Sequence, residues 1–443
     1  MTRVSSLEER VMICELGHAG YTHAQIAEQT SWSVPTVRKW RARERRLGRK
    51  GLTVRRGRHR EGALSSFPTL IHETVLAWRR AHPGWGAKTL RAELMIDPRF
   101  GKRRVPDRSS IARLLKEQGL TRRYDRHREL PQPTTQGCHA PHDEWEMDAR
   151  GYHSVADVGV VALINVNDRF SRVKLLSYPC CLGQRKGPLH PGTEDYQLVL
   201  RLCFVEWGLP DRLAVDHDSV FYDNTSGSPF PTRFHLWLLA LGVSLIFGPV
   251  GRATNQAITE RSHQTWARQV LEGQSFSCWQ VLHDALLRRR DFMNLHLPCA
   301  PLGELPPLVA HAEALTPCRL YRPEQEAQLV DLARVHAYLS QGRWFRRVSR
   351  SGNTGLGGYS YNLGKACASQ EAEITFDPTD RHLVFRSEDG STTKRLPIRG
   401  ITPLALMGRL GPLASLNQFQ LALPLSWKDW QMIRLCETFS DTT

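Results

Sequence analysis

The stretch Trp145-Glu146-Met147-Asp148 is the starting point for interpreting this chain. It ends in a carboxylate and is followed closely by the apolar segment at residues 158–166. Together the two segments predict a hairpin of buried strands, with Asp148 at the end of the first run. Other acids that the fold brings beside Asp148 could act together with it.

Two distant acids complete a set of three. Asp216 ends another short apolar strand, directly after the turn at residues 209–211. Glu260 lies early in residues 255–271, which we expect to be a helix. Two strand ends and a helix can bring three carboxylates together. Mg²⁺ is bound by few carboxylates, with water and substrate phosphate completing its shell, so the pattern predicts a divalent-metal site at Asp148, Asp216 and Glu260.

The order of these residues resembles that of the DDE transposases and retroviral-type integrases, and in particular of insertion-sequence transposases. In that family a Trp precedes the first Asp by three residues, as Trp145 precedes Asp148. An Arg follows the third acid, as Arg261 follows Glu260. Asp-Arg-Phe-Ser-Arg at residues 168–172 matches a further family signature. The resemblance implies a ribonuclease-H-like core, a mixed five-stranded sheet with helices on both faces.

The resemblance is good over residues 143–297 and looser elsewhere, and the chain departs from the family in defined places. Asp216-His217-Asp218 stands where the family has Asp-Asn-Gly, and Gln256-Ala257 replaces an Asn-Gly before the Glu. The turn-rich residues 223–229 lengthen the interval between the second and third acids. Ala267 occupies the place of a family Lys, with Arg268 next to it.

The chemistry that the resemblance implies is transfer of a DNA phosphoryl group by two Mg²⁺ ions, for which Mn²⁺ can substitute. Asp148 would bridge both ions, Asp216 would hold one and Glu260 the other. The ions would stabilise the attacking and leaving oxygens, with water as nucleophile for 3′-end cleavage and the freed 3′-hydroxyl for strand transfer. The side chains expected to position DNA beside the acids are Arg261, His263 and Arg268.

The charge of the chain is unevenly distributed. Its 443 residues carry a formal charge of +16. Residues 1–142 hold 29 Lys and Arg against 13 Asp and Glu, whereas the remainder holds 31 of each. The whole excess therefore lies in the N-terminal third, as expected of a segment that neutralises phosphates.

Residues 1–50 predict a three-helix DNA-binding domain of the helix-turn-helix type. Residues 7–16 form an amphipathic first helix, and Thr22 and Gln25 have capping-box spacing for a second. Ser33 can cap a third helix, which resembles the recognition helix of transposases. An ordinary solvated helical hairpin is the alternative. The residues of the third helix that can reach bases and phosphates are Thr36, Arg38, Lys39 and Arg41.

Residues 51–66 predict a basic linker. From Arg38 to Arg60, twelve of twenty-three residues are Lys or Arg, and such a run does not fold alone. It either lies along a minor groove or is a solvated connection, and the two interpretations are compatible. The side chains expected to contact DNA are Arg55, Arg56, Arg58 and Arg60.

Residues 67–120 predict a second helix-turn-helix domain. Its helices are expected at Thr69–Ala81, at residues 87–95 and after residues 106–107, where Arg108 is a further candidate DNA contact. Trp-Gly-Ala-Lys-Thr-Leu at residues 85–90 is similar to the second helix-turn-helix of the family. Residues 121–142 are expected to be a linker into the core.

The segments after the core are expected to be smaller. Residues 298–335 predict a Pro-rich linker with one amphipathic helical segment, and residues 401–443 a tail. Residues 336–400 alternate in short runs, which predicts a small β-barrel. Arg and aromatic residues alternate around Trp344, so the barrel either contacts DNA backbone or exposes a charged rim.

Cysteine usage and hydropathy indicate a cellular location. The ten cysteines have no Cys-x-x-Cys spacing, which suits reduced thiols. Cys138, His139 and His142 suggest zinc only weakly, because a second pair of ligands is missing. There is no apolar run near membrane length and no signal-peptide core. We therefore expect a cytoplasmic, nucleoid-associated protein with no membrane partner.

The partners expected from the resemblance are DNA, as element ends and as target, and further copies of this chain assembled on it. The sequence does not show whether an accessory ATPase takes part. Two alternatives to an active transposase remain open. One is a catalytically degenerate copy that acts as a sequence-specific DNA-binding regulator. The other is a structural or RNA-directed nuclease with the same core.

Overall fold

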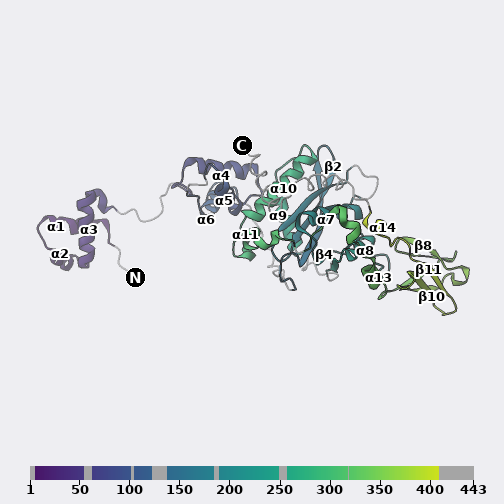
Figure 1. The fold of residues 1–443 in the computed structure, drawn as a ribbon. Helices are drawn as coiled ribbons and strands as arrows, with labels where there is room; N and C mark the ends of the chain where they lie inside the picture. Colours follow the sequence, from purple (N-terminus) through teal and green to yellow (C-terminus); the bar gives the residue numbers. More distant parts are fainter. Residues whose placement is uncertain are drawn as a thin grey trace. The chain divides into compact units, whose positions relative to one another are not determined.

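A computed structural model describes residues 5–53, 62–100, 104–121, 137–183, 189–248, 257–317 and 319–408, excluding the side chains of residues 257–260. The chain divides into a unit at Met1–Ser65 and a unit at Ser66–Thr443. Figure 1 shows their elements coloured along the sequence.

The first unit is a three-helix domain. Helices α1 (Leu7–His18), α2 (His23–Thr30) and α3 (Val34–Leu47) precede a short 3₁₀ helix, η1 (Arg49–Leu52). A capping box at Thr22 and Gln25 starts α2, as their spacing predicts. Ser33 differs from its expectation, because its hydroxyl contacts Thr36 Oγ1 at 2.9 Å and makes no cap hydrogen bond. The core consists of Ile13, Cys14, Ile26, Val37, Trp40 and Leu52.

The second unit begins with helices α4 (Thr69–Ala81), α5 (Ala87–Ile96) and α6 (Arg108–Glu117). These helices pack against the core that follows. The indole Nε1 of Trp85 donates to the Gln269 carbonyl at 3.2 Å, and Gln269 Nε2 donates to Thr89 Oγ1 at 3.1 Å. A side chain at Gly84 would collide with the Arg268 carbonyl, so the backbones approach closely there. The segment expected to be a separate DNA-reading domain therefore belongs to the same compact unit as the core.

The core contains a mixed five-stranded sheet, as predicted. Its strands are β1 (Glu144–Val155), β2 (Gly159–Asp168), β3 (Lys174–Cys181), β4 (Arg212–Val215) and β5 (Ser244–Phe247), in the order β3-β2-β1-β4-β5. β1, β2 and β3 are antiparallel neighbours, whereas β1, β4 and β5 run parallel. The antiparallel hairpin of β1 and β2 is the one that the stretch around Asp148 predicts.

Helices cover both faces of this sheet (Figure 1). On one side lie α7 (Thr193–Trp207) and α8 (Arg233–Ala240). On the other lie α9 (Ala257–Trp266), a π-helical turn η3 (Ala267–Leu271) and α10 (Trp279–Leu295). The side chains of β2 alternate between the two faces. Ala162 and Ile164 join the α7 core, while Val161 and Leu163 join the core of η3 and α10.

The segment that follows differs from the expected linker, because it packs into the core. It contains the short helices η4 (Ala300–Leu302), α11 (Pro307–Ala310), η5 (Ala312–Leu315), η6 (Pro323–Gln325), α12 (Glu326–Leu329) and α13 (Leu332–Leu339). Glu326 is fully buried, and Arg201 Nε donates to its Oε2 at 2.7 Å. Trp237 Nε1 donates to the same carboxylate at 2.8 Å. A buried, paired charge of this kind fixes the segment in place.

The C-terminal strands form an open sheet instead of the expected small barrel. β6 (Arg343–Arg347), β9 (Glu371–Asp377), β10 (His382–Ser387) and β11 (Thr393–Pro397) have the order β11-β10-β9-β6, and β7 (Asn353–Leu356) pairs with β8 (Tyr359–Asn362) as a separate hairpin. Among the described residues β6 and β11 do not pair, so the sheet does not close. A short η7 (Lys365–Cys367) and α14 (Pro403–Met407) complete this part. Within the described ranges no helix is both long and apolar enough to cross a membrane.

Candidate active site

Asp148 and Asp216 lie side by side at the junction of β1 and β4. The parallel register pairs Glu146 with Ala214, and continuing it by two residues places Asp148 opposite Asp216. Val215 points into the α7 core, so the alternation of β4 directs Asp216 to the other face. Both carboxylates line a cavity of about 60 Å³. Strand register thus brings together two of the three predicted acids.

The two carboxylates repel each other in a partly buried setting. Burial raises the pKa of Asp148 to about 7, and the charge of Asp216 adds to the effect. Burial also raises the pKa of Asp216, and the charge of Asp218 contributes. A nearby cation would relieve this repulsion, so the pair has the electrostatic character of a site for positive charge.

Asp216, not Asp218, faces the cavity. The Asp218 carboxylate accepts a hydrogen bond from the Val220 backbone N–H at 2.8 Å and so starts the following turn. The Asp218 N–H donates to Asp216 Oδ1 at 3.0 Å, which fixes the orientation of the Asp216 carboxylate. Between them, the His217 ring packs on Tyr222 and Phe247, with centroid distances of 5.0 and 5.4 Å. This turn, which stands where the proteins that the sequence resembles have a tight Gly turn, is therefore held by aromatic packing.

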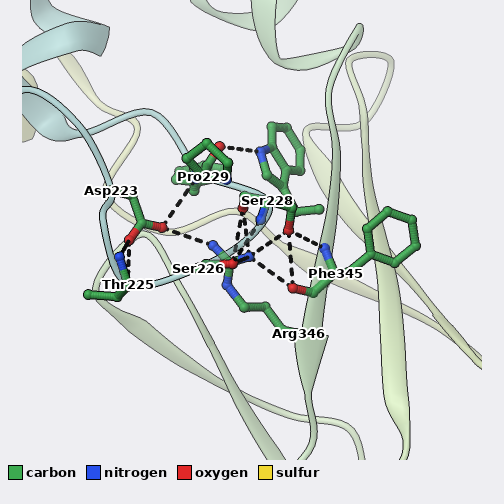
Figure 2. A network of polar contacts seen from close by, with 9 residues as sticks. Asp223, Thr225, Ser226, Ser228, Pro229, Phe345 and Arg346 are labelled. Carbon is green, nitrogen blue, oxygen red and sulfur yellow. Dashed lines mark hydrogen bonds and ion pairs between the residues drawn. The ribbon is translucent and has the colours of Figure 1, made fainter. Parts of the chain in front are cut away.

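The insertion at residues 223–229 is bound to the C-terminal sheet, as Figure 2 shows. Arg346 Nη1 donates to Ser226 Oγ at 2.6 Å and to the Ser228 carbonyl at 2.7 Å, and its Nη2 lies 3.0 Å from Asp223 Oδ2. Asn224 Nδ2 donates to the His217 carbonyl at 2.7 Å. The inserted loop thus connects β6 to the turn that carries the second acid.

Helix α9 lies over the acidic pair. The backbone of Glu260 belongs to α9, but its side chain, predicted to lie beside the other two acids, is outside the described residues. His263, one turn further on, places its Nε2 3.7 Å from Asp148 Oδ2. Burial lowers the pKa of His263 to about 4, helped by Arg150 and Lys174, so the imidazole is neutral at physiological pH. His263 therefore faces Asp148 instead of the solvent.

The described residues fit a divalent metal in part. Asp148 and Asp216 offer hard oxygen ligands on adjacent strands, and their mutual repulsion favours a bound cation. No three His, Cys, Asp or Glu side chains of the described residues form a cluster that could hold a metal. The predicted set needs Glu260 as its third member, and that side chain is not among them.

The zinc alternative does not fit the environment of His142. This ring is buried, its Nε2 is 2.8 Å from the Ala314 carbonyl, and its Nδ1 is 3.1 Å from Trp145 Nε1. Both ring nitrogens therefore have hydrogen-bond partners within the core.

A polar strip crosses the sheet beneath α9. The register places Asn165 opposite Asp148 and Asn167 opposite Glu146. Lys174 Nζ donates to Asn167 Oδ1 at 3.0 Å and to Ser262 Oγ at 3.2 Å, and Ser262 donates to the same Asn167 oxygen at 3.0 Å. Burial lowers the pKa of Lys174 to about 8. This triangle attaches α9 to β2 and β3, two residues after Glu260.

The predicted DNA contacts lie in varied environments. On α3, Arg38 and Lys39 are exposed, whereas Arg41 donates to the Gly17 carbonyl at 3.1 Å and so helps to hold α1. Thr36 is half-buried against Ser33. In the second unit Arg108 and Arg261 are exposed and Arg268 is half-buried. The four linker residues Arg55, Arg56, Arg58 and Arg60 lie outside the described residues.

Three basic residues that were not among the predicted DNA contacts lie near Arg261 and Arg268. Lys88, Arg172 and Lys174 line the same cavity as those two, with a volume of about 420 Å³. Arg172 lies inside the signature at residues 168–172, and Lys174 follows it on β3. That proximity in sequence is the one signal that points to them, and it does not reveal the contribution of Lys88.

Solved structures that match this chain include viral integrases. The HTLV-2 integrase catalytic core domain in complex with magnesium shares 12% identity, with 39% of this chain and 97% of that chain covered and a TM-score of 0.28. A chain of the simian T-cell lymphotropic virus intasome with PP2A regulatory subunit B56 gamma shares 10%, covering 74% and 96%, with a TM-score of 0.30. The BIV integrase catalytic core domain shares 14%, covering 39% and 95%, with a TM-score of 0.28. No family model matches the chain.

Proposed function

We propose that this protein is a DNA transposase of the integrase type, which cleaves the 3′ ends of an element and joins them to target DNA. The observation that carries the proposal is the pair of adjacent carboxylates on β1 and β4, which repel each other beneath the helix that bears Glu260. Phosphoryl transfer depends mostly on positioned charge, and Glu260 on α9 would add a third carboxylate to the two at the strand ends.

The residues of the site have distinct tasks in this proposal. Asp148, Asp216 and Glu260 would hold Mg²⁺, or Mn²⁺ in its place. When bound, two such ions stabilise the charge on the attacking and leaving oxygens. The Asp218 N–H orients the Asp216 carboxylate. Because His263 is neutral, it contacts Asp148 without forming an ion pair with a DNA phosphate. The Lys174–Asn167–Ser262 triangle holds α9, and with it Glu260, against the sheet.

The basic N-terminal region supplies recognition of the element ends in this proposal. Arg38 and Lys39, which are exposed on α3, would read a major groove, and the linker with Arg55 and Arg58 would add phosphate contacts. Transfer of two element ends requires two active sites, so we expect several copies of the chain to assemble on DNA.

A strand-transfer assay tests the proposal. Candidate ends taken from inverted repeats flanking the gene are incubated with the full chain, target plasmid and Mg²⁺. We expect joined products with wild-type protein and none with Asp148→Asn, Asp216→Asn or Glu260→Gln. DNA binding that persists without any product from the wild type would favour the regulator, an alternative that the replacement at His217-Asp218 keeps open.

A further inference from the structure

The second cavity is lined by an unusual excess of positive charge. It lies between α5, the start of β3, α9 with η3, and the segment at residues 297–307. No acidic side chain of the described residues is among those that line it. We refer to it as the basic pocket, and its cations are Lys88, Arg172, Lys174, Arg261 and Arg268.

Among the described residues, Arg172 and Lys174 of the basic pocket have no ion-pair partner. Arg172 is half-buried, and its guanidinium has no hydrogen bond or ion pair with any described residue. Its backbone has a φ of 64°, an uncommon conformation for a non-glycine residue. Lys174 donates to the neutral side chains of Asn167 and Ser262. Lys88 forms an ion pair with Glu304 at 3.4 Å, where both side chains are partly exposed.

This electrostatic arrangement favours the entry of an anion. Five cationic side chains gather around one cavity, and Glu146, a carboxylate that acts on both Arg172 and Lys174, does not line it. A guanidinium group can donate two parallel hydrogen bonds to two oxygens of one phosphate, and the buried ammonium of Lys174 adds a point charge. A volume of about 420 Å³ accommodates a phosphate with its sugar, but not a duplex. The chemistry of the pocket therefore suits a phosphodiester of a single strand.

The basic pocket and the acidic pair share the helix α9. Arg261 and Ser262 line the basic pocket, while the next residue, His263, contacts Asp148. Lys174 and Glu146 lie on the same sheet face, separated by Asn167 on the strand between them. A strand that binds in the basic pocket is thus adjacent to the acids along one surface of the core.

We propose that the basic pocket binds a backbone phosphate of the DNA strand that the acidic site acts on. Because Lys88 comes from α5, the pocket is complete only when α4, α5 and α6 are docked on the core through Trp85. Helices α4, α5 and α6 then serve to hold the reacting strand. This inference rests on the proposed function, and it gives residues 67–120, which the sequence predicts to be a second helix-turn-helix domain, a contact with the reacting strand.

Cys299 provides a reporter for the basic pocket, because it lines the cavity and interacts electrostatically with Arg172 and Lys174. Cys278, which is also partly exposed and lies at the start of α10, is the matched control. The full chain is treated with iodoacetate or iodoacetamide, and alkylation of each cysteine is followed by mass spectrometry. We expect the anionic reagent to favour Cys299 over Cys278 when each rate is divided by that for the neutral reagent.

DNA protection then identifies the ligand. A single strand in Ca²⁺ should slow alkylation of Cys299 several-fold and leave Cys278 unchanged, whereas the same concentration of inorganic phosphate should not. Equal protection by inorganic phosphate would indicate a site for a free anion and would overturn the proposal. Equal alkylation of Cys299 with and without DNA would overturn it as well.

Substitutions test the same contact independently of alkylation. Arg172→Gln should reduce the slope of log affinity for DNA against log salt by about one, the loss of one phosphate contact. Arg334→Gln, a surface change on α13 outside the pocket, should leave the slope unaltered. An unaltered slope in Arg172→Gln would contradict the proposal. Protection of Cys299 without any DNA cleavage would refute the proposed function alone, whereas cleavage without protection would refute the pocket alone.

Discussion

The acidic pair and the basic pocket lie under one helix, but they are built from the chain in different ways. Asp148 and Asp216 meet because two neighbouring parallel strands place them in register, and each is the end of a recognisable apolar run. The basic pocket combines Lys88 with Arg268, residues brought together by the docking of a helical segment on the core. The acidic pair can therefore be inferred from local sequence patterns, whereas the basic pocket depends on tertiary contacts.

The largest expected effect separates two neighbouring acids of the same turn. Asp216→Asn should lower the rate of DNA cleavage by at least about 10³-fold, because it removes a charge that the reaction requires. Asp218→Asn should lower it only a few-fold, because that carboxylate caps a turn at Val220. Single-turnover cleavage of a labelled DNA end measures both. The opposite ranking would show that Asp218 is the second ligand.

The next largest effect is expected on the free energy of unfolding, when the docking of helices α4, α5 and α6 on the core is disturbed. Trp85→Ala removes a buried indole between α5 and the core and should reduce the free energy of unfolding by about 3 kcal/mol. Leu70→Ala, on the exposed face of α4, should change it by less than about 0.5 kcal/mol. Urea denaturation of the full chain gives both values. Similar stability of the two variants would mean that the docking contributes little.

The smallest effect concerns the pH dependence of DNA binding. Lys174 has a folded-state pKa of about 8, below its ordinary value, because of burial. It is charged at pH 7 and loses its proton as the pH rises through 8, so the salt slope of DNA binding should fall between pH 7 and pH 9. Lys174→Met should show the lower slope at both pH values. A slope in the wild type that is independent of pH would exclude Lys174 from the phosphate contact.

The comparison of the two sites also explains which features of the fold can be predicted from the sequence. The run that ends at Asp148, the apolar strand after it and the strand before Asp216 predict the sheet, because strand alternation and length are local properties. The role of Trp85 is not visible in the same way, since its partner Gln269 lies 184 residues away. The burial of Glu326 against Arg201, 125 residues away, is hidden for the same reason, and a Pro-rich composition then suggests a linker.

Closure of a sheet is a second property that local pattern does not determine. The alternation at residues 373–376 and 382–385 predicts strands, and both are present within β9 and β10. Whether the outer strands pair with each other depends on register and curvature, which one sequence does not specify. The expectation of a barrel was therefore wrong about closure, although the strands were expected.

The central claim is that Asp148 and its neighbours bind a divalent metal, and metal binding can be measured without a known DNA substrate. Calorimetric titration of Mn²⁺ into the full chain should show binding that Asp148→Asn weakens at least about tenfold, since a ligand is lost. Asp218→Asn, which alters the turn and not the cavity, should retain the wild-type affinity. Equal Mn²⁺ affinity in the wild type and Asp148→Asn would contradict the claim.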